Sequence, residues 1–263
     1  MLEKVKYIVA VASGKGGVGK STTAVNTALA LKSLGKRVGL LDADIYGPSI
    51  AKMLGVDEDH RPEVVEDKYF KPVMAHGLAT MSMAYLATDK TPMVWRGPMA
   101  AGALQQLLQQ TDWGELDILV VDMPPGTGDI QLTLAQKVQI AGAVIVTTPQ
   151  DIALLDAKKG IEMFIKVKIP VLGIVENMAI HICTQCGHQE TIFGSGGGAQ
   201  VAEQYQTKLL GSLPLDRSIR EQCDEGLGDN KPQIEALYKQ IAQSVIDSLA
   251  QLDIDQPPEI VFQ

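Results

Sequence analysis

Residues 13–22 read Ser-Gly-Lys-Gly-Gly-Val-Gly-Lys-Ser-Thr, and this stretch decides the fold. Residues 14–21 match the phosphate-loop pattern GxxxxGK(S/T), with a second lysine, Lys15, directly after the first glycine. An apolar run of strand character precedes the loop at residues 5–12, and helical spacing follows it at residues 22–34. A strand, a glycine-rich loop and a helix in this order are the context that the motif requires, so the sequence predicts a bound nucleoside triphosphate.

The residue types of this loop suit phosphate binding. Glycine lets the backbone approach closely enough for its N–H groups to surround phosphates at a helix N-terminus. Lys20 is predicted to reach the β- and γ-phosphates, and the Ser21 hydroxyl to ligate Mg²⁺. A chance glycine turn is the alternative, and the flanking strand and helix argue against it. The predicted nucleotide-binding residues of the loop are Gly14, Lys15, Gly16, Gly17, Val18, Gly19, Lys20, Ser21 and Thr22.

Length and composition indicate one domain of residues 1–263. Hydrophobic residues make up 46% of the 263 residues, which is enough for a substantial core. No apolar run approaches the roughly 18–20 residues of a transmembrane helix, and the N-terminus shows no cleavable signal. We therefore expect a soluble, cytoplasmic protein without a membrane partner. The net charge of −8 argues against a nucleic-acid partner, because phosphate backbones bind basic surfaces.

Apolar runs of strand length recur along the chain and alternate with helical patterns. Runs of Val, Ile and Leu without polar alternation are typical of parallel strands that are buried on both faces. The predicted fold is therefore α/β and doubly wound, a mostly parallel sheet with helices on both faces, and its ligands collect at the carboxyl ends of the strands. The predicted strands span residues 5–12, 37–42, 78–83, 117–122, 142–148, 171–175 and 209–213.

Two segments interrupt this pattern. Residues 57–76 are polar and charged, and we expect an excursion that carries short strands. Residues 176–198 hold a Cys-x-x-Cys and end in Gly-Ser-Gly-Gly-Gly, so we expect a loop-rich insertion. The last helix is predicted at residues 232–252, with an apolar stripe that packs on the core. A membrane-surface helix is the alternative, but it would carry Lys and Arg on its polar face.

Carboxylates follow two of the predicted strands and face the phosphate loop. Asp42 and Asp44 end the strand at 37–42; such a pair can hold Mg²⁺ through water, with Asp44 orienting an attacking water. Capping of a following helix is the alternative for this pair. Asp122 ends a Walker B-type strand and is predicted in the Mg²⁺ shell with Asp42 and Ser21. The next residues predict a nucleotide-dependent switch of Gly126, Thr127, Gly128 and Asp129.

The loop resembles the deviant Walker A class, which includes MinD, ParA and the nitrogenase iron protein. Within that class the chain resembles the Mrp (ApbC/Nbp-type) iron–sulfur cluster carriers. Together the matching motifs are specific to this family, whereas the loop alone marks only the larger class. The motifs are Asp-Ala-Asp-Ile-Tyr-Gly-Pro-Ser (42–49), Trp-Arg-Gly-Pro-Met (95–99), Asp-Met-Pro-Pro-Gly-Thr-Gly-Asp (122–129), Thr-Thr-Pro-Gln (147–150), Glu-Asn-Met (176–178), Cys-x-x-Cys-Gly (183–187), Ile-Phe-Gly-x-Gly-Gly-Gly (192–198) and Leu-Pro-Leu-Asp (213–216).

The resemblance implies an ATPase that works as a homodimer, with ATP or ADP near the interface. Lys15 would then reach the partner's phosphates and act in catalysis as an arginine finger does, together with Lys20 and Asp44. The resemblance also implies that Asn177 reads the adenine edge, beside the loop that holds Pro214 and Asp216. Many bacterial relatives carry a small additional domain before the ATPase, and some eukaryotic ones an N-terminal cysteine cluster; neither is expected here.

Cys183 and Cys186 are two of the three cysteines, and their spacing points both thiolates at one metal. A four-sulfur site needs two more ligands, which a two-fold dimer supplies. A [4Fe–4S] cluster bridged between subunits fits this count and the family resemblance. Alternatively, His181 and His188 complete a zinc site within one chain, or zinc fills the four-cysteine dimer site. A redox-active dithiol is a further alternative.

The combined hypothesis is an ATP-hydrolysing carrier that assembles or transfers this cluster to recipient apoproteins, with a cluster assembly scaffold as a further partner. One alternative is a MinD/ParA-like regulatory switch with a structural zinc site. Another is a nitrogenase-reductase-like electron donor, although that class takes its ligands from two separated cysteines. Cys223 is interpreted as an ordinary thiol. The segment at 95–98 is either a structural corner or a contact for the dimer or the switch. The sequence does not favour one of these two interpretations.

Overall fold

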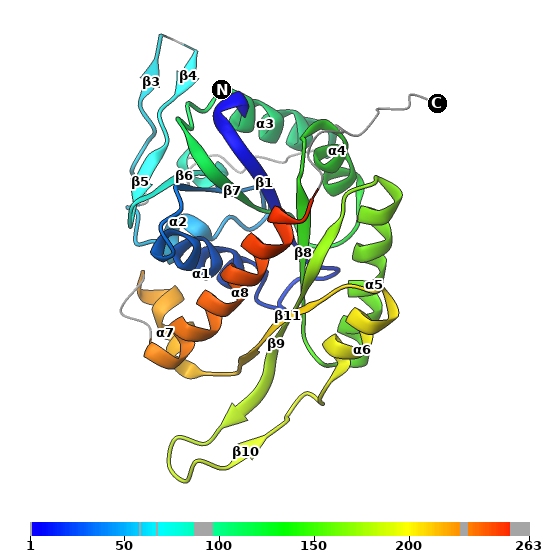
Figure 1. The fold of residues 1–263 in the computed structure, drawn as a ribbon. Coiled ribbons are helices and arrows are strands. Elements are labelled where there is room, and N and C mark those ends of the chain that lie inside the picture. The colour runs from blue at the N-terminus through cyan, green and yellow to red at the C-terminus, as the bar shows by residue number, and fades with distance from the viewer. Residues whose placement is uncertain (1, 58, 67, 87–96, 227–230, 253–263) are drawn as a thin grey trace.

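The computed structural model describes residues 2–57, 59–66, 68–86, 97–226 and 231–252. A central sheet with the strand order β11-β9-β8-β1-β7-β2-β6-β5 runs through the molecule (Figure 1). Its neighbouring strands are parallel except β5, which is antiparallel to β6 at one edge, and the short β10 (Gln189–Glu190), which is antiparallel to the end of β9. The other strands of this sheet are β1 (Val5–Ala12), β2 (Val38–Asp42), β5 (Val73–Ala75), β6 (Leu78–Ser82), β7 (Leu116–Asp122), β8 (Gly142–Thr147), β9 (Val171–Ile182) and β11 (Leu209–Pro214).

Helices cover both faces of this sheet, as the sequence predicted (Figure 1). Helices α1 (Lys20–Ser33), α2 (Ile50–Met53), α7 (Arg217–Glu225) and α8 (Pro232–Ala250) pack on one face. Helices α3 (Gly97–Gln110), α4 (Asp129–Lys137), α5 (Asp151–Lys166) and α6 (Gly197–Gln204) pack on the other. Short 3₁₀ helices occur at Leu2–Lys4 and Met83–Tyr85.

The core consists of two apolar layers that share the strands of the sheet. Along β1, Ile8 and Ala10 point into one layer, whereas Val9 and Val11 point into the other. Both sets are buried, which explains why this strand is apolar without polar alternation. The predicted stripe of α8 packs on the core, with Ile241 fully buried, so the interpretation of that helix as a core element is confirmed.

The polar segment at 57–76 contains the short strands that the sequence predicted. Strand β3 (Val64–Val65) and strand β4 (Tyr69–Phe70) form an antiparallel hairpin beyond the sheet edge, and β5 follows directly. No helix of the described ranges is long and apolar enough to cross a lipid bilayer. Residues 95 and 96 of the predicted corner lie outside the described residues, and α3 begins at Gly97.

The prediction of a loop-rich insertion at 176–198 was wrong for residues 176–182. Strand β9 continues to Ile182 instead of ending near Val175, and β10 (Gln189–Glu190) returns antiparallel to it. The reason is tertiary pairing: Ser212 of β11 lies opposite Glu176, and Pro214 lies opposite Ile180. Such pairing overrides the polar local sequence that suggested a loop. The cysteines therefore lie at the tip of a protruding hairpin.

Candidate functional site

The phosphate loop connects the end of β1 to the start of α1, at the carboxyl edge of the sheet. Its backbone depends on glycine at two packed positions. A Cβ atom at Gly14 would lie 2.0 Å from the carbonyl oxygen of Asp156 in α5. Gly19 has a φ of 82°, and a Cβ there would lie 2.1 Å from Nδ2 of Asn177. The loop is therefore held between α5 and the middle of β9, with no room for a side chain at either glycine.

Lys20 is the centre of the polar site beneath this loop. Its Nζ lies 2.7 Å from Oδ1 of Asp122, 3.2 Å from Oγ of Ser21 and 3.8 Å from Oδ2 of Asp44. Lys20 is 6% exposed and Asp122 is completely buried. The structure thus brings together Lys20 of the phosphate loop, Asp44 after β2 and Asp122 at the end of β7, as the sequence predicted.

Asp122 has one oxygen available beside the lysine. Burial raises the pKa of its carboxyl, and the charge of Lys20 opposes this rise. Its Oδ2 is buried and has no hydrogen-bond partner among the described residues. A buried acceptor without a donor, next to the Ser21 hydroxyl, has the chemistry of an Mg²⁺ ligand or of an acceptor for a metal-bound water. Asp122 and Ser21 therefore fit the Mg²⁺ ion that the sequence predicted.

Asp42 lies opposite Asp122 in the parallel register of β2 and β7, but its oxygens are already occupied. Oδ1 accepts a hydrogen bond from the Asp44 N–H at 3.1 Å. Oδ2 accepts from the N–H groups of Ser49 and Ile50, at the start of α2, and from the Ser82 hydroxyl. Burial, followed by the charge of Asp122, raises the pKa of Asp42 to about 7.

The arrangement around Asp42 matches the capping alternative weighed for the pair of carboxylates. Its hydrogen bond to the Asp44 backbone also helps to fix the turn that carries Asp44. Asp44 is 9% exposed, accepts a hydrogen bond from the Gly47 N–H at 3.2 Å and keeps Oδ2 near Lys20. A contact of Asp42 with Mg²⁺ stays a prediction, and so does the action of Asp44 on an attacking water.

Lys15 contrasts with Lys20 because its ammonium group has no partner among the described residues. Its carbonyl oxygen accepts a hydrogen bond from the Ser13 hydroxyl at 2.8 Å, which fixes the backbone of the loop. Its side chain forms no hydrogen bond or ion pair with the described residues, and the residue is half-buried. A positive charge at this rim is therefore available to an anion supplied from outside the subunit.

The predicted switch is attached to the phosphate loop through its backbone. The N–H of Gly126 donates to the carbonyl of Ser13 at 2.9 Å. Thr127, Gly128 and Asp129 are exposed, with Asp129 opening α4. A change at the loop can thus reach α4 through one hydrogen bond and a short glycine-containing turn.

Gln131 is a residue of this region that the sequence reasoning missed. Its Nε2 donates to the carbonyls of Pro124 and Pro125 at 3.2 and 2.5 Å, and the residue is 5% exposed. It lies on the buried face of α4 beside Ile130 and Leu134. A glutamine on an apolar helix face is the signal that could have identified it, because buried amides need partners.

Asn177 lies under the phosphate loop. Its Nδ2 donates to the carbonyl of Val18 at 2.9 Å, and the residue is 7% exposed. Pro214 ends β11, and Asp216 caps α7 by accepting from the N–H and hydroxyl of Ser218. Although partial burial works against it, the hydrogen bonds from Ser218 and Lys231 lower the pKa of Asp216. The side chains predicted beside adenine thus have structural partners, and their contact with the base stays a prediction.

The cysteine pair lies in the turn of the β9–β10 hairpin. The Cys183 N–H donates to the His188 carbonyl, and the Gly187 N–H donates to the Cys183 carbonyl, both at 2.9 Å. Hydrogen bonds from the N–H groups of Cys186 and then Gln185 lower the pKa of the Cys183 thiol. Such bonds stabilise a thiolate, which is the form that binds metal.

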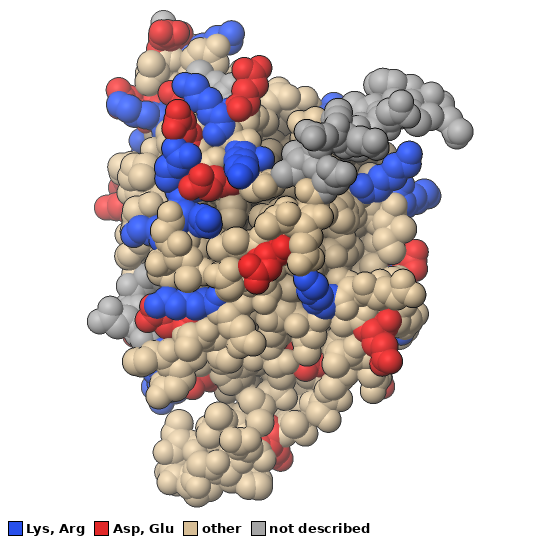
Figure 2. Space-filling view, viewed as in Figure 1, with Lys and Arg blue, Asp and Glu red and all other residues tan. Residues whose placement is uncertain are grey.

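The hairpin does not complete a metal site by itself. Over the described ranges, no group of three or more His, Cys, Asp or Glu side chains is placed to hold one metal ion. The ring of His181 lies with Nδ1 3.3 Å from the Leu215 carbonyl. The single-chain zinc site considered for His181 and His188 is therefore not formed in this structure. Figure 2 shows the hairpin as an uncharged projection, because residues 177–189 contain no Lys, Arg, Asp or Glu.

Cys223 lies elsewhere, behind the start of α1. Its Sγ is 3.7 Å from Oγ1 of Thr22, although the two residues are far apart in sequence. Burial raises the pKa of this thiol, and the residue is 8% exposed. These surroundings are those of a packed, protonated thiol.

The whole chain is similar to proteins that handle iron–sulfur clusters. A family model described as "ParA: NUBPL iron-transfer P-loop NTPase" matches residues 4–249. An iron-sulfur cluster carrier protein from Pseudomonas fragi is 63% identical over 245 residues, which is 92% of this chain and 85% of that protein. The carrier protein from Escherichia coli K12 is 59% identical over 263 residues, 98% of this chain and 71% of that protein. The iron-sulfur cluster transfer protein NUBPL of Mus musculus is 53% identical over 86% of this chain and 70% of its own length.

Solved structures give the same result for the fold. A nucleotide-binding protein from Archaeoglobus fulgidus in complex with ADP is 39% identical, with a TM-score of 0.76 over 86% of this chain and 88% of that chain. The cell division ATPase MinD of Pyrococcus furiosus has a TM-score of 0.67 at 23% identity, over 92% and 99% of the two chains. The predicted doubly wound P-loop NTPase fold is confirmed.

Proposed function

Since the chain belongs to the family of NUBPL iron-transfer P-loop NTPases, we propose that it hydrolyses ATP and carries a [4Fe–4S] cluster to apoproteins. The observation that carries this proposal is a hairpin with two accessible thiols on the same subunit as a complete phosphate loop. Relatives named as carriers and an ADP-bound neighbour support the two halves of the proposal. The hairpin would be difficult to explain in a purely regulatory ATPase.

The nucleotide half of the function uses the buried lysine and its carboxylates. On ATP binding, Lys20 exchanges its bond to Asp122 for the β- and γ-phosphates, while backbone N–H groups of residues 14–21 surround the phosphates. Asp44 accepts a hydrogen bond from the attacking water, since its Oδ2 faces the same space as Lys20. Mg²⁺, held by Ser21 and Asp122, would neutralise charge on the phosphates when bound.

A second copy of the chain would complete the site. The side chain of Lys15 forms no hydrogen bond or ion pair with the described residues, so its charge is free to meet a nucleotide of the opposing subunit. Beside the loop, Ile152 and Leu155 on α5 are 69% and 58% exposed, and Asp156 of the same helix contacts Gly14. Apolar side chains exposed next to an unpaired cation favour a subunit interface over a free surface. The proposed partner is therefore an identical subunit in the cytoplasm.

The same dimer supplies the remaining cluster ligands. One hairpin provides Cys183 and Cys186, and a two-fold axis brings an equivalent pair to the same place. Four thiolates then match the ligand count of a [4Fe–4S] cluster. Such a cluster, at the exposed tips of two hairpins, is accessible to an assembly scaffold and to recipient apoproteins. It is cargo in this proposal, and zinc is its competitor for the same thiolates.

ATP state and cluster binding would be coupled through the switch. Gly126 is bonded to Ser13 of the phosphate loop, so a γ-phosphate that moves this loop also moves the turn at 126–129. Closing of the dimer around Lys15 would change how the two hairpins approach each other. Nucleotide then shifts the population between cluster-holding and cluster-releasing states.

Anaerobic reconstitution with iron and sulfide tests the cluster proposal. We expect a brown protein with iron and sulfide in equal amounts, and we expect the variants Cys183→Ser and Cys186→Ser to stay colourless. Cys223→Ser is the matched control and should reconstitute normally, because its thiol is buried behind α1. Equal colour in all the variants, or zinc as the only metal of the anaerobically isolated protein, would refute the carrier function. Transfer to an apo-enzyme, read as recovered activity, tests delivery.

A further inference from the structure

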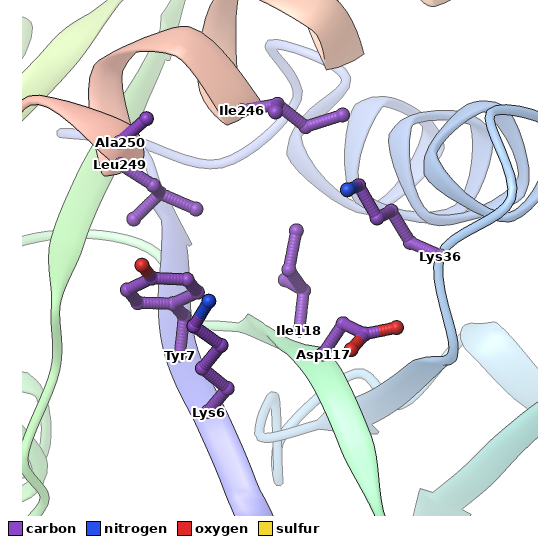
Figure 3. A pocket seen from close by; sticks show the side chains of 8 residues that line it. All are labelled: Lys6, Tyr7, Lys36, Asp117, Ile118, Ile246, Leu249 and Ala250. Carbon is purple, nitrogen blue, oxygen red and sulfur yellow. The ribbon is translucent and has the colours of Figure 1, made fainter.

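A pocket of about 170 Å³ lies at the amino ends of β1 and β7, under the last turns of α8 (Figure 3). This volume greatly exceeds the roughly 10–15 Å³ that one water needs. Its apolar wall comes from Ile118 of β7 and from Ile246, Leu249 and Ala250 of α8. The phosphate loop lies at the opposite, carboxyl edge of the sheet, so this pocket is separate from the nucleotide site.

The rim of the pocket is positive although the chain is acidic overall. Lys6 and Lys36 line it from two sides, and Lys6 Nζ lies 5.0 Å from the centre of the Tyr7 ring. Asp117 is the carboxylate of the lining, and it pairs with Arg37 through bonds of 3.1 and 3.4 Å; Arg37 also pairs with Glu115 at 2.7 Å. The hydrogen bond from the Arg37 side chain lowers the pKa of Asp117. Two lysines above an apolar floor suit a ligand that is both acidic and apolar.

The geometry points to one occupant: residues 253–263 of the same chain. This segment lies outside the described residues. It reads Asp-Ile-Asp-Gln-Pro-Pro-Glu-Ile-Val-Phe-Gln, with three carboxylates and four large apolar residues. Its charge is opposite to that of the rim, and its apolar residues match the floor.

The covalent link between α8 and residues 253–263 favours binding of this segment in the pocket. The segment begins three residues after Ala250, which itself lines the pocket. Eleven extended residues span up to about 36 Å, so the segment can turn back over a pocket that begins at its root. The tether also provides an effective concentration of order millimolar, which allows a weak contact to be occupied. The inference is independent of the proposed ATPase and carrier activities.

Binding in trans to full-length protein tests the inference. The chain with Ile260→Ser, Val261→Ser and Phe262→Ser keeps its net charge and should leave the pocket open. We expect a fluorescent peptide of residues 253–263 to bind this variant saturably by anisotropy. Its affinity for the wild-type chain should be at least tenfold lower, because the attached segment already occupies the pocket.

Charge reversal at the rim supplies the second arm. In the triple-serine background, Lys6→Glu with Lys36→Glu should weaken peptide binding at least tenfold, and added salt should weaken it in the parent. Lys52→Glu with Lys166→Glu is the matched control, since both lysines are exposed and form no ion pair with the described residues. Circular dichroism and size-exclusion chromatography check that every variant is folded and has an unchanged oligomeric state.

Several results would overturn the inference. One is the absence of peptide binding to the folded triple-serine chain. Another is equal affinity for that chain and the wild type, which would mean that the attached segment does not fill the pocket. If the two charge-reversal pairs weakened peptide binding equally, the overall charge of the protein and not the pocket would explain the binding. A larger oligomer that is lost in the triple-serine chain would show that the segment binds a second copy instead.

Discussion

Lys20 and Asp122 form a buried ion pair, with Nζ 2.7 Å from Oδ1, that joins the first residue of α1 to the last residue of β7. The pair holds the lysine beneath the phosphate loop before any nucleotide is bound. A buried ion pair adds little net stability compared with apolar residues, but removing one partner leaves an uncompensated charge. The pair therefore links nucleotide binding to the integrity of the sheet edge.

Replacement of Lys20 should cost stability as well as activity. We expect Lys20→Met to lower the free energy of unfolding by about 3 kcal/mol and to abolish ATP hydrolysis. Adding Asp122→Asn removes the stranded charge, so the double variant should regain more than half of the lost stability and none of the hydrolysis. Urea unfolding and phosphate release measure the two effects. A double variant as unstable as Lys20→Met would contradict the assigned pairing.

Lys15 should act on the nucleotide of the neighbouring subunit. We expect Lys15→Ala to slow hydrolysis at least a hundredfold, as loss of a cation at the transferred phosphate does, with little change in ATP affinity. Mixed with the Lys20→Met/Asp122→Asn chain, it should recover about a quarter of the wild-type activity. Random pairing makes half of the dimers mixed, and each mixed dimer has one complete site. A mixture as inactive as its components would show that Lys15 acts within its own subunit.

The phosphate loop and most strands could be predicted because their signals are local. The glycine spacing requires a particular backbone, and an unbroken run such as residues 118–121 requires burial on both faces. The extension of β9 past Val175 could not be predicted, because it depends on pairing with β11, more than thirty residues further along the chain. Local polarity in that segment favoured a loop.

The types of residue in the candidate site could be predicted from the sequence, but the role of each residue was harder to predict. Asp42 was predicted near Mg²⁺, yet its oxygens accept hydrogen bonds from Asp44, from Ser49 and Ile50 at the start of α2, and from Ser82, which only the folded chain brings close. Cys223 gains its partner Thr22 in the same way, from a distant segment, whereas Gln131 bonds to the nearby turn at Pro124 and Pro125. Spacing motifs identify groups that act on a ligand; they do not identify the residues that hold those groups in place.

Gln131 should control the switch rather than nucleotide affinity. In Gln131→Leu the carbonyls of Pro124 and Pro125 lose their donor, so the turn before Gly126 is no longer fixed to α4. We expect kcat to fall about tenfold with an ATP dissociation constant within twofold of the wild type. Gln136→Leu is the matched control, because it lies exposed on the same helix. A raised dissociation constant with unchanged kcat would assign Gln131 to nucleotide binding.

The cysteines of the fully reduced protein should react with iodoacetamide in a fixed order. N–H groups of Cys186 and Gln185 lower the pKa of Cys183, so its thiolate persists at a lower pH than an ordinary thiol allows. Burial raises the pKa of Cys223, so its thiolate is scarce near neutral pH. We expect the alkylation rate of Cys183, followed by peptide mass spectrometry, to rise at a lower pH than that of Cys223. The difference should disappear in denaturant. If Cys223 of the folded protein reacted as fast as Cys183 at pH 7, the hairpin turn would not stabilise a thiolate, and the metal-binding assignment would lose its electrostatic basis.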